Sequence, residues 1–520
     1  MEAKMKQKEK KSFVLKSLDA VEKVGNSLPH PATLFIILSA IVIVISAIMG
    51  SMGVSVSYDA VDTATGSIVQ NTVTAQSLLT ADGIRYMFTN VMANFTGFFP
   101  LGPVFTIILC VGVAEGTGFL SAGLRKIAAV TPRRYVTAMV VLLGIVSNIA
   151  SSTGYVVLVP LGAIVFMSFG RHPIAGLAAA FAGVSGGWSA NLLIGSNDPM
   201  FAGISTQAAH MLDPNYLVQP TSNWFFMVVS TFLITGVATY VTEKIIEPRL
   251  GEYKPEKGEG VVEDITNLEK RGMKFGLLSL LVYVLVIAAL VVPENGILRN
   301  PETGGVLTSP FMSSIIPIMG GVFLVPGLFY GIGAKVIKND KDVIDLMIKG
   351  ISGITGFLVL VFFAGQFIKH FEYSNIGTII SVNGAQFLEN TGFVGLPLII
   401  CFIVLTAIIN IFIAVDSAKW VLMAPIFVPM FMRLGFSPEL TQVVYRIGDS
   451  CTNVIAPLMP FFALIVAFCQ KYDKKAGVGT LITTMIPYSI AFLLGWIVLF
   501  IAWYFLKLPL GPGSPLFYPM

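Results

Sequence analysis

Two stretches of this chain share one pattern and decide its fold: STGYVVLVPLGAIVFMSFGRHPIAGLAAAFAGVS at 152–185 and SAKWVLMAPIFVPMFMRLGFSPELTQVVYRIGDS at 417–450. An offset of 265 positions (417 − 152) aligns them without a gap, and nine of the 34 aligned positions are identical. Roughly two or three identities are expected by chance in so biased a composition. The chain therefore contains an internal repeat. The identical positions in the first copy are Ser152, Val156, Pro160, Phe166, Met167, Gly170, Pro173, Gly183 and Ser185, and Tyr155 falls on Trp420.

The composition around the repeat is that of a polytopic membrane protein. Of 520 residues, 55% are hydrophobic and only 12% are charged, about half the charge of a soluble domain. Continuous apolar runs such as 33–53 and 275–292 are long enough to cross a bilayer as helices. Strands of an outer-membrane barrel would instead alternate apolar and polar residues. The net charge of +4 does not indicate nucleic-acid binding, because the basic residues lie at span ends and in short loops.

Both copies of the repeat contain short apolar runs separated by polar breaks. SNIASSTGY at 147–155 and DSAKW at 416–420 each divide two runs of about ten residues, too short to span a bilayer alone, so we expect a re-entrant hairpin in each half. An interrupted helix follows each hairpin. The first is broken at 186–187 and 197–199, and we expect the second to be broken at 448–450 and again at Pro457 and Pro460. Matching broken helices in two halves are typical of the substrate site of a secondary transporter.

Basic residues predict how the chain crosses the membrane, because Lys and Arg are enriched in cytoplasmic loops. They gather before residue 12 and at 244–274, 335–341 and 471–475, whereas 54–90 and 294–310 carry only Arg85 and Arg299. We therefore expect a cytoplasmic N-terminus and an external C-terminus. The predicted organisation is an N-terminal cytoplasmic segment (1–30), a first half (31–242) with a hairpin at about 137–169 and a broken helix at about 173–205, a cytoplasmic loop (243–274), a second half (275–510) with a hairpin at about 397–435 and a broken helix at about 439–470, and a tail (511–520).

Charged residues inside the apolar segments are the main candidates for function, because burying them in a membrane is costly. Asp198 has no basic residue within ten positions, so it is a loop residue outside the membrane, a carrier of protons or sodium, or a polar ligand to substrate. Asp449 lies three residues after Arg446, and Asp416 three before Lys419, a spacing that places each pair on one helix face. Each pair is either a structural ion pair with no role in binding or part of a site. In the second case Arg446 binds a substrate carboxylate and Asp449 takes a cation or a proton.

Several neutral residues of the two breaks could complete a site. Ser152, Asn148, Asn197, Asn410 and Ser417 offer hydrogen bonds, and Tyr155 and Trp420 offer rigid aromatic surfaces. The four histidines and four cysteines have no spacing typical of metal ligands, so no metal site is expected, although sodium could bind near Asp198 or Asp449. No phosphate-binding GxxxxGK[ST] motif is present, and we expect an ion gradient rather than ATP to drive transport.

With these residues located, the chain resembles the p-aminobenzoyl-glutamate transporter (AbgT-type) family over nearly its whole length. The resemblance rests on several segments together: VEKVGNSLPHPATLF at 21–35, GRHPIAGLAAAFAGVSGGWSANLLIGSNDP at 170–199, APIFVPMFMRLGFSPE at 424–439 and YRIGDSCTN at 445–453. It implies a dimeric bacterial inner-membrane protein with about nine transmembrane helices, each long enough to cross the bilayer, and two re-entrant hairpins. The expected fold class is thus all-α, with an internal repeat that we expect to be inverted.

The resemblance also implies which residues form the site. The family's functional positions fall on Asp198, Asn410, Ser417, Trp420, Arg446 and Asp449, with Pro438 and Pro457 as structural breaks beside them. It does not account for Asp416 and Lys419. The family includes importers of p-aminobenzoyl-glutamate and exporters of sulfonamide antimetabolites, so the expected partner is an aromatic carboxylate or a sulfonamide, moved by a proton or sodium gradient with no cofactor.

Two other functions remain open from the sequence. One is an importer of dicarboxylates or other organic anions, coupled to sodium or protons. The other is an intramembrane aspartyl protease, suggested by IGD at 447–449. Such a protease needs a second membrane aspartate in a Tyr-Asp context, and the YD pairs at 58–59 and 472–473 both lie in polar segments. We therefore expect a transporter and not an enzyme.

Overall fold

The computed structural model of the chain describes residues 29, 31–61, 68–99, 101–129, 132–150, 154–195, 197–251, 253, 266–306, 309–352, 355–457, 459 and 461–518. The N-terminal segment 1–30 apart from Pro29, most of the loop at 252–265, and Ser152 lie outside these residues. The described part is mostly helical. It is not all-α as predicted, because strands β1 (Ser55–Val61) and β2 (Ile68–Thr74) form an antiparallel pair. The alternation of SVSYDAV and IVQNTVT is typical of strands, and the apolar spans around them hid this signal.

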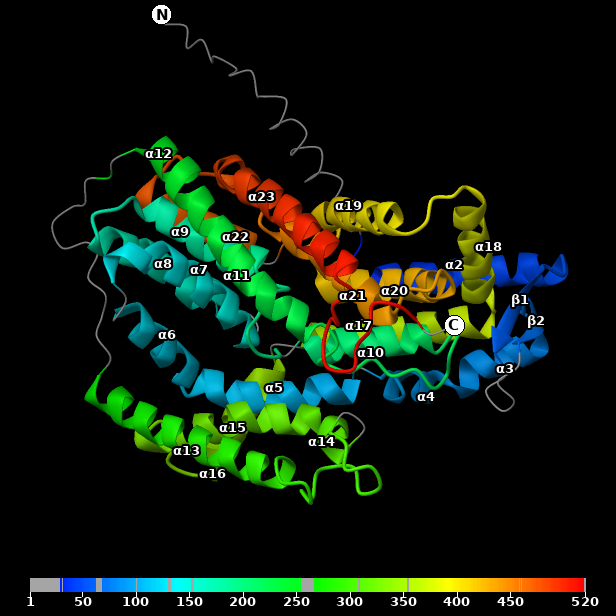
Figure 1. Cartoon of the computed structure of the whole chain (residues 1–520), viewed down its shortest axis with the longest axis horizontal. Coiled ribbons are helices and arrows are strands. Elements are labelled where there is room, and N and C mark those ends of the chain that lie inside the picture. The colour runs from blue at the N-terminus through cyan, green and yellow to red at the C-terminus, as the bar shows by residue number, and fades with distance from the viewer. Residues whose placement is uncertain are drawn as a thin grey trace, which may run out of the picture.

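Helices outside the repeat form two groups (Figure 1). In the first, α5 packs against α15 and α16, and α15 packs against α13. In the second, α17 packs against α2 and α18 contacts β1, so the strand pair lies at one end of the molecule. The bounds of the first group are α5 (Leu101–Gly116), α6 (Phe119–Ala129), α13 (Asn267–Val291), α14 (Pro310–Ser313), α15 (Ile315–Gly333) and α16 (Asp340–Ser352). Those of the second are α2 (Pro31–Ser51), α3 (Ala81–Thr89), α4 (Val91–Thr96), α17 (Thr355–Tyr373) and α18 (Ile376–Asn390).

The two repeat halves pack against each other through α11 and α23, which run side by side in Figure 1, and through α10, α20 and α21. The first half comprises α7 (Val136–Ser147), α8 (Val159–Ser168), α9 (Pro173–Phe181), α10 (Asp198–Ala209), α11 (Trp224–Val241) and α12 (Glu247–Leu250). Short 3-10 or π turns lie at 133–135, 148–150, 154–158, 182–186 and 242–246. The second half comprises α19 (Leu396–Phe412), α20 (Asp416–Arg433), α21 (Pro438–Asn453), α22 (Phe462–Tyr472) and α23 (Val478–Phe505).

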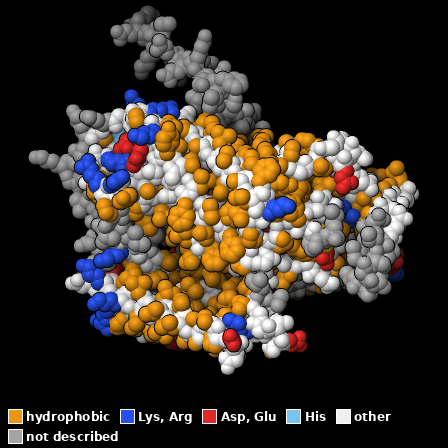
Figure 2. All heavy atoms as spheres, in the orientation of Figure 1, with side chains coloured by type: hydrophobic (Ala, Val, Ile, Leu, Met, Phe, Trp, Pro, Cys, Tyr) orange, Lys and Arg blue, Asp and Glu red, His pale blue; other side chains and the backbone are white. Residues whose placement is uncertain are grey.

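Five described helices are long and apolar enough to cross a membrane, and a sixth is counted if α16 and α17 form one span bent by 51°. They are Ala32–Ser51, Trp224–Leu250, Asn267–Val291, Ile315–Gly333 and Val478–Phe505. Leu101–Gly116, Gly154–Ser168, Pro173–Gly186 and Leu396–Phe412 are shorter apolar helices. Figure 2 shows a broad hydrophobic surface, with Lys and Arg gathered at the end where α12 lies and α13 begins. The chain is thus a multi-pass membrane protein, while the count of nine spans remains a prediction.

The offset of 265 found in the sequence also relates the helix boundaries. Helices α7 and α19 end at Ser147 and Phe412, α8 and α20 end at Ser168 and Arg433, and α9 and α21 begin at prolines 173 and 438. Between them, Gly170 and Gly435 both adopt a left-handed conformation, with φ of 71° and 82°. That conformation favours glycine and closes each helix end by a backbone bond of 2.9 Å, Arg171 N to Phe166 O and Phe436 N to Phe431 O.

Each hairpin folds back on itself. In the first, Arg133 before α7 donates to the carbonyl of Phe169 after α8 at 3.2 Å, so the outer ends of the two helices meet. In the second, the ring of Phe402 on α19 lies 4.6 Å from Phe427 and 5.2 Å from Phe431 on α20. These contacts lie far along the helices from the connection at 413–415, so the two arms meet again through their aromatic side chains. Their re-entry within a membrane remains a prediction.

The predicted break at 448–450 is wrong, because α21 runs without interruption from Pro438 to Asn453. Gly448 instead permits close packing: a Cβ added there would meet the carbonyl oxygen of Ile403 and, at 2.7 Å, the Cβ of Thr406. Its repeat equivalent Gly183 likewise lies against the backbone of Val141. The break between 453 and 462 is present and contains Pro457, and in the first half helix resumes at Asp198 after residues 187–197.

We expect Gly448→Val to destabilise the protein, because the new side chain would be forced into the backbone of α19. Overpacking of this kind costs about 1–3 kcal/mol. Gly236→Val is the matched control, since a Cβ at that α11 position meets nothing within 4 Å. Thermal melting in detergent should show a lower Tm for Gly448→Val alone, and equal melting of the two variants would contradict the packing role.

Candidate functional site

Two ion pairs lie in the interior where the repeat halves meet. Arg446 Nη1 is 2.7 Å from Asp198 Oδ1, and these side chains are 4% and 3% exposed. Lys419 Nζ is 2.5 Å from Asp449 Oδ1, and neither side chain is exposed. Removing charges from water is expensive, and a buried pair is tolerated only when its geometry and its other hydrogen bonds compensate. The four charges therefore constrain how the surrounding helices pack.

The first pair joins the two halves of the molecule. Asp198 begins α10 directly after the break of the first half, and its Oδ2 accepts the Gly195 N–H at 2.6 Å. Arg446 comes from the middle of α21 and lies 5.0 Å from the ring centroid of Phe201, one turn along α10. A carboxylate at a helix N-terminus is further stabilised by the helix dipole. The broken helix of one half thus supplies the acid and the intact helix of the other supplies the base.

The partners differ from those that sequence spacing predicts. Arg446 pairs with Asp198 and not with Asp449, and Lys419 pairs with Asp449 and not with Asp416. The i, i+3 spacing brings side chains to one face of an isolated helix, but a pair formed there is worth only about 0.2–0.5 kcal/mol. In a dry interior, full charge compensation between different helices outweighs that preference. The prediction of i, i+3 pairs was therefore wrong.

Lys419 of α20 lies between oxygen atoms of α19 and α21, which we call its oxygen cage. Its Nζ donates to Oδ1 of Asn410, at the end of α19, and to Oδ1 of Asp449. The Asn410 amide group donates in turn to Asp449 O, Thr452 Oγ1 and Asn453 Oδ1 at 2.8, 3.0 and 2.7 Å. Because these acceptors hold the NH₂ group, the amide oxygen must face Lys419. The second oxygen of Asp449 accepts from Asn453 Nδ2 at 3.3 Å.

Asp416 is held by a residue that the sequence did not single out. The indole Nε1 of Trp188, in the first half, donates to Asp416 Oδ2 at 2.8 Å, while the Ser417 N–H donates to Oδ1 at 2.6 Å. The Tyr445 hydroxyl donates to the backbone oxygen of Asp416, also at 2.6 Å. Asp416 is thus a second connection between the halves, at the start of α20.

A chain of neutral hydrogen bonds continues from Trp420. Its indole Nε1 donates to Ser205 Oγ at 3.1 Å, Ser205 donates to Gln442 Oε1 at 2.7 Å, and Gln442 Nε2 donates to Asn223 Oδ1 at 2.8 Å. The Trp420 ring lies 4.3 Å from that of Tyr445, and both are fully buried. Sequence reasoning missed Ser205, Asn223 and Gln442. Gln442 lies in 438–453, all of which is buried although much of it is polar, and this burial was not visible in the sequence.

The remaining predicted site residues lie outside the two ion pairs. Tyr155 is buried and stacks on Phe461 with a centroid distance of 4.6 Å and an interplanar angle of 8°. Asn148 donates to Val184 O at 3.0 Å, Asn197 precedes α10 without capping it through its side chain, and Ser417 is buried in the first turn of α20. Pro438 is the first residue of α21, and Pro457 lies in the break after it.

Some of the buried polar atoms without a hydrogen-bond partner in the described part of the chain belong to the ion pairs or to α19 and α21. They include Arg446 Nε, Ser450 Oγ and Thr406 Oγ1. Such groups are costly unless another molecule bonds to them, so they are candidate contacts for a small polar ligand. The described residues contain no group of three or more His, Cys, Asp or Glu side chains that could hold a metal ion.

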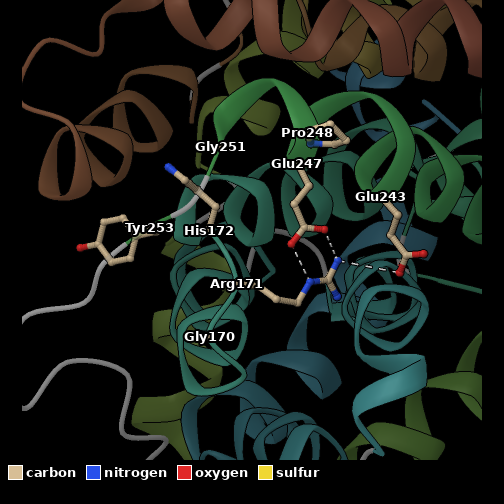
Figure 3. A pocket seen from close by; sticks show the side chains of 8 residues that line it. All are labelled: Gly170, Arg171, His172, Glu243, Glu247, Pro248, Gly251 and Tyr253. Atoms are coloured by element: carbon tan, nitrogen blue, oxygen red, sulfur yellow. Dashed lines mark hydrogen bonds and ion pairs between the residues drawn. The ribbon is translucent and has the colours of Figure 1, made fainter.

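A separate cleft of about 510 Å³ lies at the turn between α8 and α9. Figure 3 shows Glu243 and Glu247 directed toward Arg171, and Arg171 donates to both oxygens of Glu247 at 2.8 and 2.6 Å. This ion pair connects the first hairpin to the start of α12. Burial lowers the pKa of His172, which leaves a neutral ring to accept the Ile174 N–H at 3.2 Å. We assign the cleft a structural role.

Comparison with known proteins finds relatives that match nearly the whole chain. The model of the family described as "AbgT putative transporter family" matches residues 16–518. The chain is 39% identical to the p-aminobenzoyl-glutamate transport protein of Escherichia coli (strain K12), over 95% of each chain. It is 47% identical to MtrF of Neisseria gonorrhoeae, whose structure is described as illuminating a class of antimetabolite efflux pumps, with a TM-score of 0.90 over 96% of this chain and 100% of that one. The YdaH transporter of Alcanivorax borkumensis is 42% identical, with a TM-score of 0.87 over 93% and 100% of the chains.

We expect Gln442→Leu to destabilise the protein by about 2–4 kcal/mol, because it leaves both Ser205 and Asn223 buried with a lost partner. Gln470→Leu is the control, since its amide makes one bond of 3.0 Å to Ala476 O at an exposed position and should cost less than about 0.5 kcal/mol. Melting temperatures of the purified variants test this. If both variants melted alike, the buried chain would not hold the halves together.

Proposed function

The chain belongs to the AbgT transporter family, and we propose that it is a secondary transporter of p-aminobenzoyl-glutamate or related aromatic carboxylates, driven by an ion gradient. The observation that carries this proposal is the buried Asp198–Arg446 pair between the two repeat halves. A cation–carboxylate pair sealed from water at such a boundary can exchange its partner only when the halves move. Coupling of that exchange to access from alternate sides is what a secondary transporter requires.

The groups around Arg446 suit an aromatic carboxylate. A guanidinium binds a carboxylate through two parallel hydrogen bonds, and Arg446 retains an unpartnered Nε beside the Nη1 that contacts Asp198. The Phe201 ring centroid lies 5.0 Å from the guanidinium, and the neighbouring rings of Trp420 and Tyr445 come from α20 and α21. We propose that the substrate carboxylate replaces Asp198 at Arg446, while its aromatic ring packs on these side chains.

The cation that drives transport would then bind to the acid that the substrate displaces. When a substrate carboxylate takes Arg446, Asp198 is left as an unpaired buried anion, which costs several kcal/mol unless a proton or sodium ion neutralises it. Substrate binding and cation binding thereby favour each other. Three acids (Asp198, Asp416, Asp449) against two bases (Lys419, Arg446) also leave one formal negative charge in excess when all are ionised. That excess favours entry of a cation.

Export of sulfonamide antimetabolites is a second proposed activity, supported by 47% identity to MtrF over 96% of this chain. A sulfonamide offers an aromatic ring and an ionisable sulfonamide group in place of a carboxylate, so the same guanidinium and aromatic surfaces could bind it. We place the protein in the inner membrane of a bacterium, as a homodimer with a cytoplasmic N-terminus and an external C-terminus. The basic residues gathered at one end of the molecule support that orientation.

The test is transport by the purified full-length protein in liposomes. Radiolabelled p-aminobenzoyl-glutamate and a sulfonamide are supplied with an imposed proton or sodium gradient, and uptake and efflux are followed. We expect gradient-driven accumulation by the wild type and its loss in Asp198→Asn, because the neutral amide cannot exchange a cation. Asp449→Asn should also abolish accumulation, since it leaves the Lys419 ammonium unpaired.

The control is Asp82→Asn, which removes an acid of an exposed pair with Arg85, 83% and 75% exposed. It should transport as the wild type does. Full gradient-driven transport by both Asp198→Asn and Asp449→Asn, with unchanged melting temperatures, would overturn the assignment of the site.

A further inference from the structure

We propose that the Lys419 ammonium is a built-in cation that fills an alkali-ion position at Asp449 and makes transport by this protein independent of sodium. The inference deepens the proposed function, because it names the driving ion as the proton. It rests on the geometry of the oxygen cage rather than on the comparison with relatives.

The Lys419 ammonium lies between two oxygen atoms of the kinds that also bind alkali cations. A carboxylate oxygen from Asp449 and an amide oxygen from Asn410 contact Nζ directly, and the hydroxyl of Thr452 bonds the same Asn410 amide. Carboxylate, carbonyl and hydroxyl oxygens are the ligands that hard cations prefer. Helices α19 and α21 supply these oxygens and α20 supplies the ammonium, and ion sites in transporters are typically formed at helix ends and breaks.

The ammonium is held between these oxygens by its own side chain. Lys419 extends from the first turn of α20, is completely buried and donates hydrogen bonds to Asn410 and Asp449. A free sodium ion would have to displace this ammonium. Because the ammonium is covalently attached, its effective concentration at the site does not depend on the salt concentration. The displaced ammonium would be left without a partner in a dry interior, so exchange is unfavourable.

The other acids of the site also lack a free oxygen cage. Asp198 has one oxygen on Arg446 and the other on the Gly195 N–H. Both oxygens of Asp416 accept N–H groups, from Trp188 and Ser417. Sodium needs several oxygen ligands around it at once, whereas a proton needs only one carboxylate oxygen. The arrangement of all three acids therefore favours a proton as the driving ion.

Removing the ammonium while keeping the acid should create a sodium site. The experiment compares thermal melting of the purified full-length protein in NaCl and in choline chloride at equal ionic strength. We expect no sodium-specific shift for the wild type and an increase of at least about 3 °C for Lys419→Ala in NaCl, because an ion that binds only the folded state stabilises it. Lys419→Arg, which retains a fixed cation, should show no shift, and neither should the double variant Lys419→Ala with Asp449→Asn.

A transport arm uses the same proteins in liposomes with an imposed proton gradient. Wild-type uptake of p-aminobenzoyl-glutamate should be equal in sodium and choline within twofold, and residual uptake by Lys419→Ala should require sodium. The melting arm needs no substrate. Absence of wild-type transport would therefore count against the proposed function alone, while the melting shifts still decide the role of Lys419.

A sodium-specific shift or a sodium requirement in the wild type would overturn the inference. A stable Lys419→Ala protein that melts alike in both salts would also overturn it. If Lys419→Ala folds only in NaCl, the inference is supported. If it folds in neither salt, Lys419→Gln, which keeps most of the side-chain length, takes its place with the same expected sodium shift.

Discussion

The ion pair between Asp198 and Arg446 is the constraint on which the rest of the site depends. It joins the start of α10 in one half to the middle of α21 in the other, 2.7 Å apart and almost sealed from water. An interior of this kind cannot leave either charge alone without a cost of several kcal/mol. The helices must therefore stay together until another charged molecule replaces one partner. The neighbouring contacts Trp188–Asp416 and Trp420–Ser205 cross the same boundary and add to it.

The duplicated scaffold carries chemistry that is not duplicated. Asn148 donates to Val184 O in the first half and Asn410 donates to Asp449 O in the second, and Val184 and Asp449 are repeat equivalents (449 − 184 = 265). Each half thus has an asparagine that donates to this backbone oxygen, although the side chain at that position is a valine in the first half and an aspartate in the second. Each half contributes a hairpin and the helix that follows it. Only in the second half do these elements carry the charged residues Lys419, Arg446 and Asp449.

Sequence reasoning reached the scaffold more fully than the site. Prolines 173 and 438 and glycines 170 and 435 act locally, so the helix starts and turns at these residues followed from the sequence. The ion pairs did not, because they join helices that are far apart in the chain, and only the packed structure decides which base lies nearest each acid. Gly448 was misread for the same reason: its role is contact with the α19 backbone, and a helix-breaking glycine and a packing glycine look alike in a single sequence. Trp188 and Ser205 carried no local signal at all.

The measurement that tests this account most directly is a double-mutant cycle across the central pair. The free energy of unfolding is measured for the wild type, Asp198→Asn, Arg446→Gln and the variant with both changes. Each single change should cost about 3–5 kcal/mol, because it leaves one buried charge unpaired, and the double variant should be more stable than either. Losses that simply add would show that the two charges do not hold the halves of this transporter together.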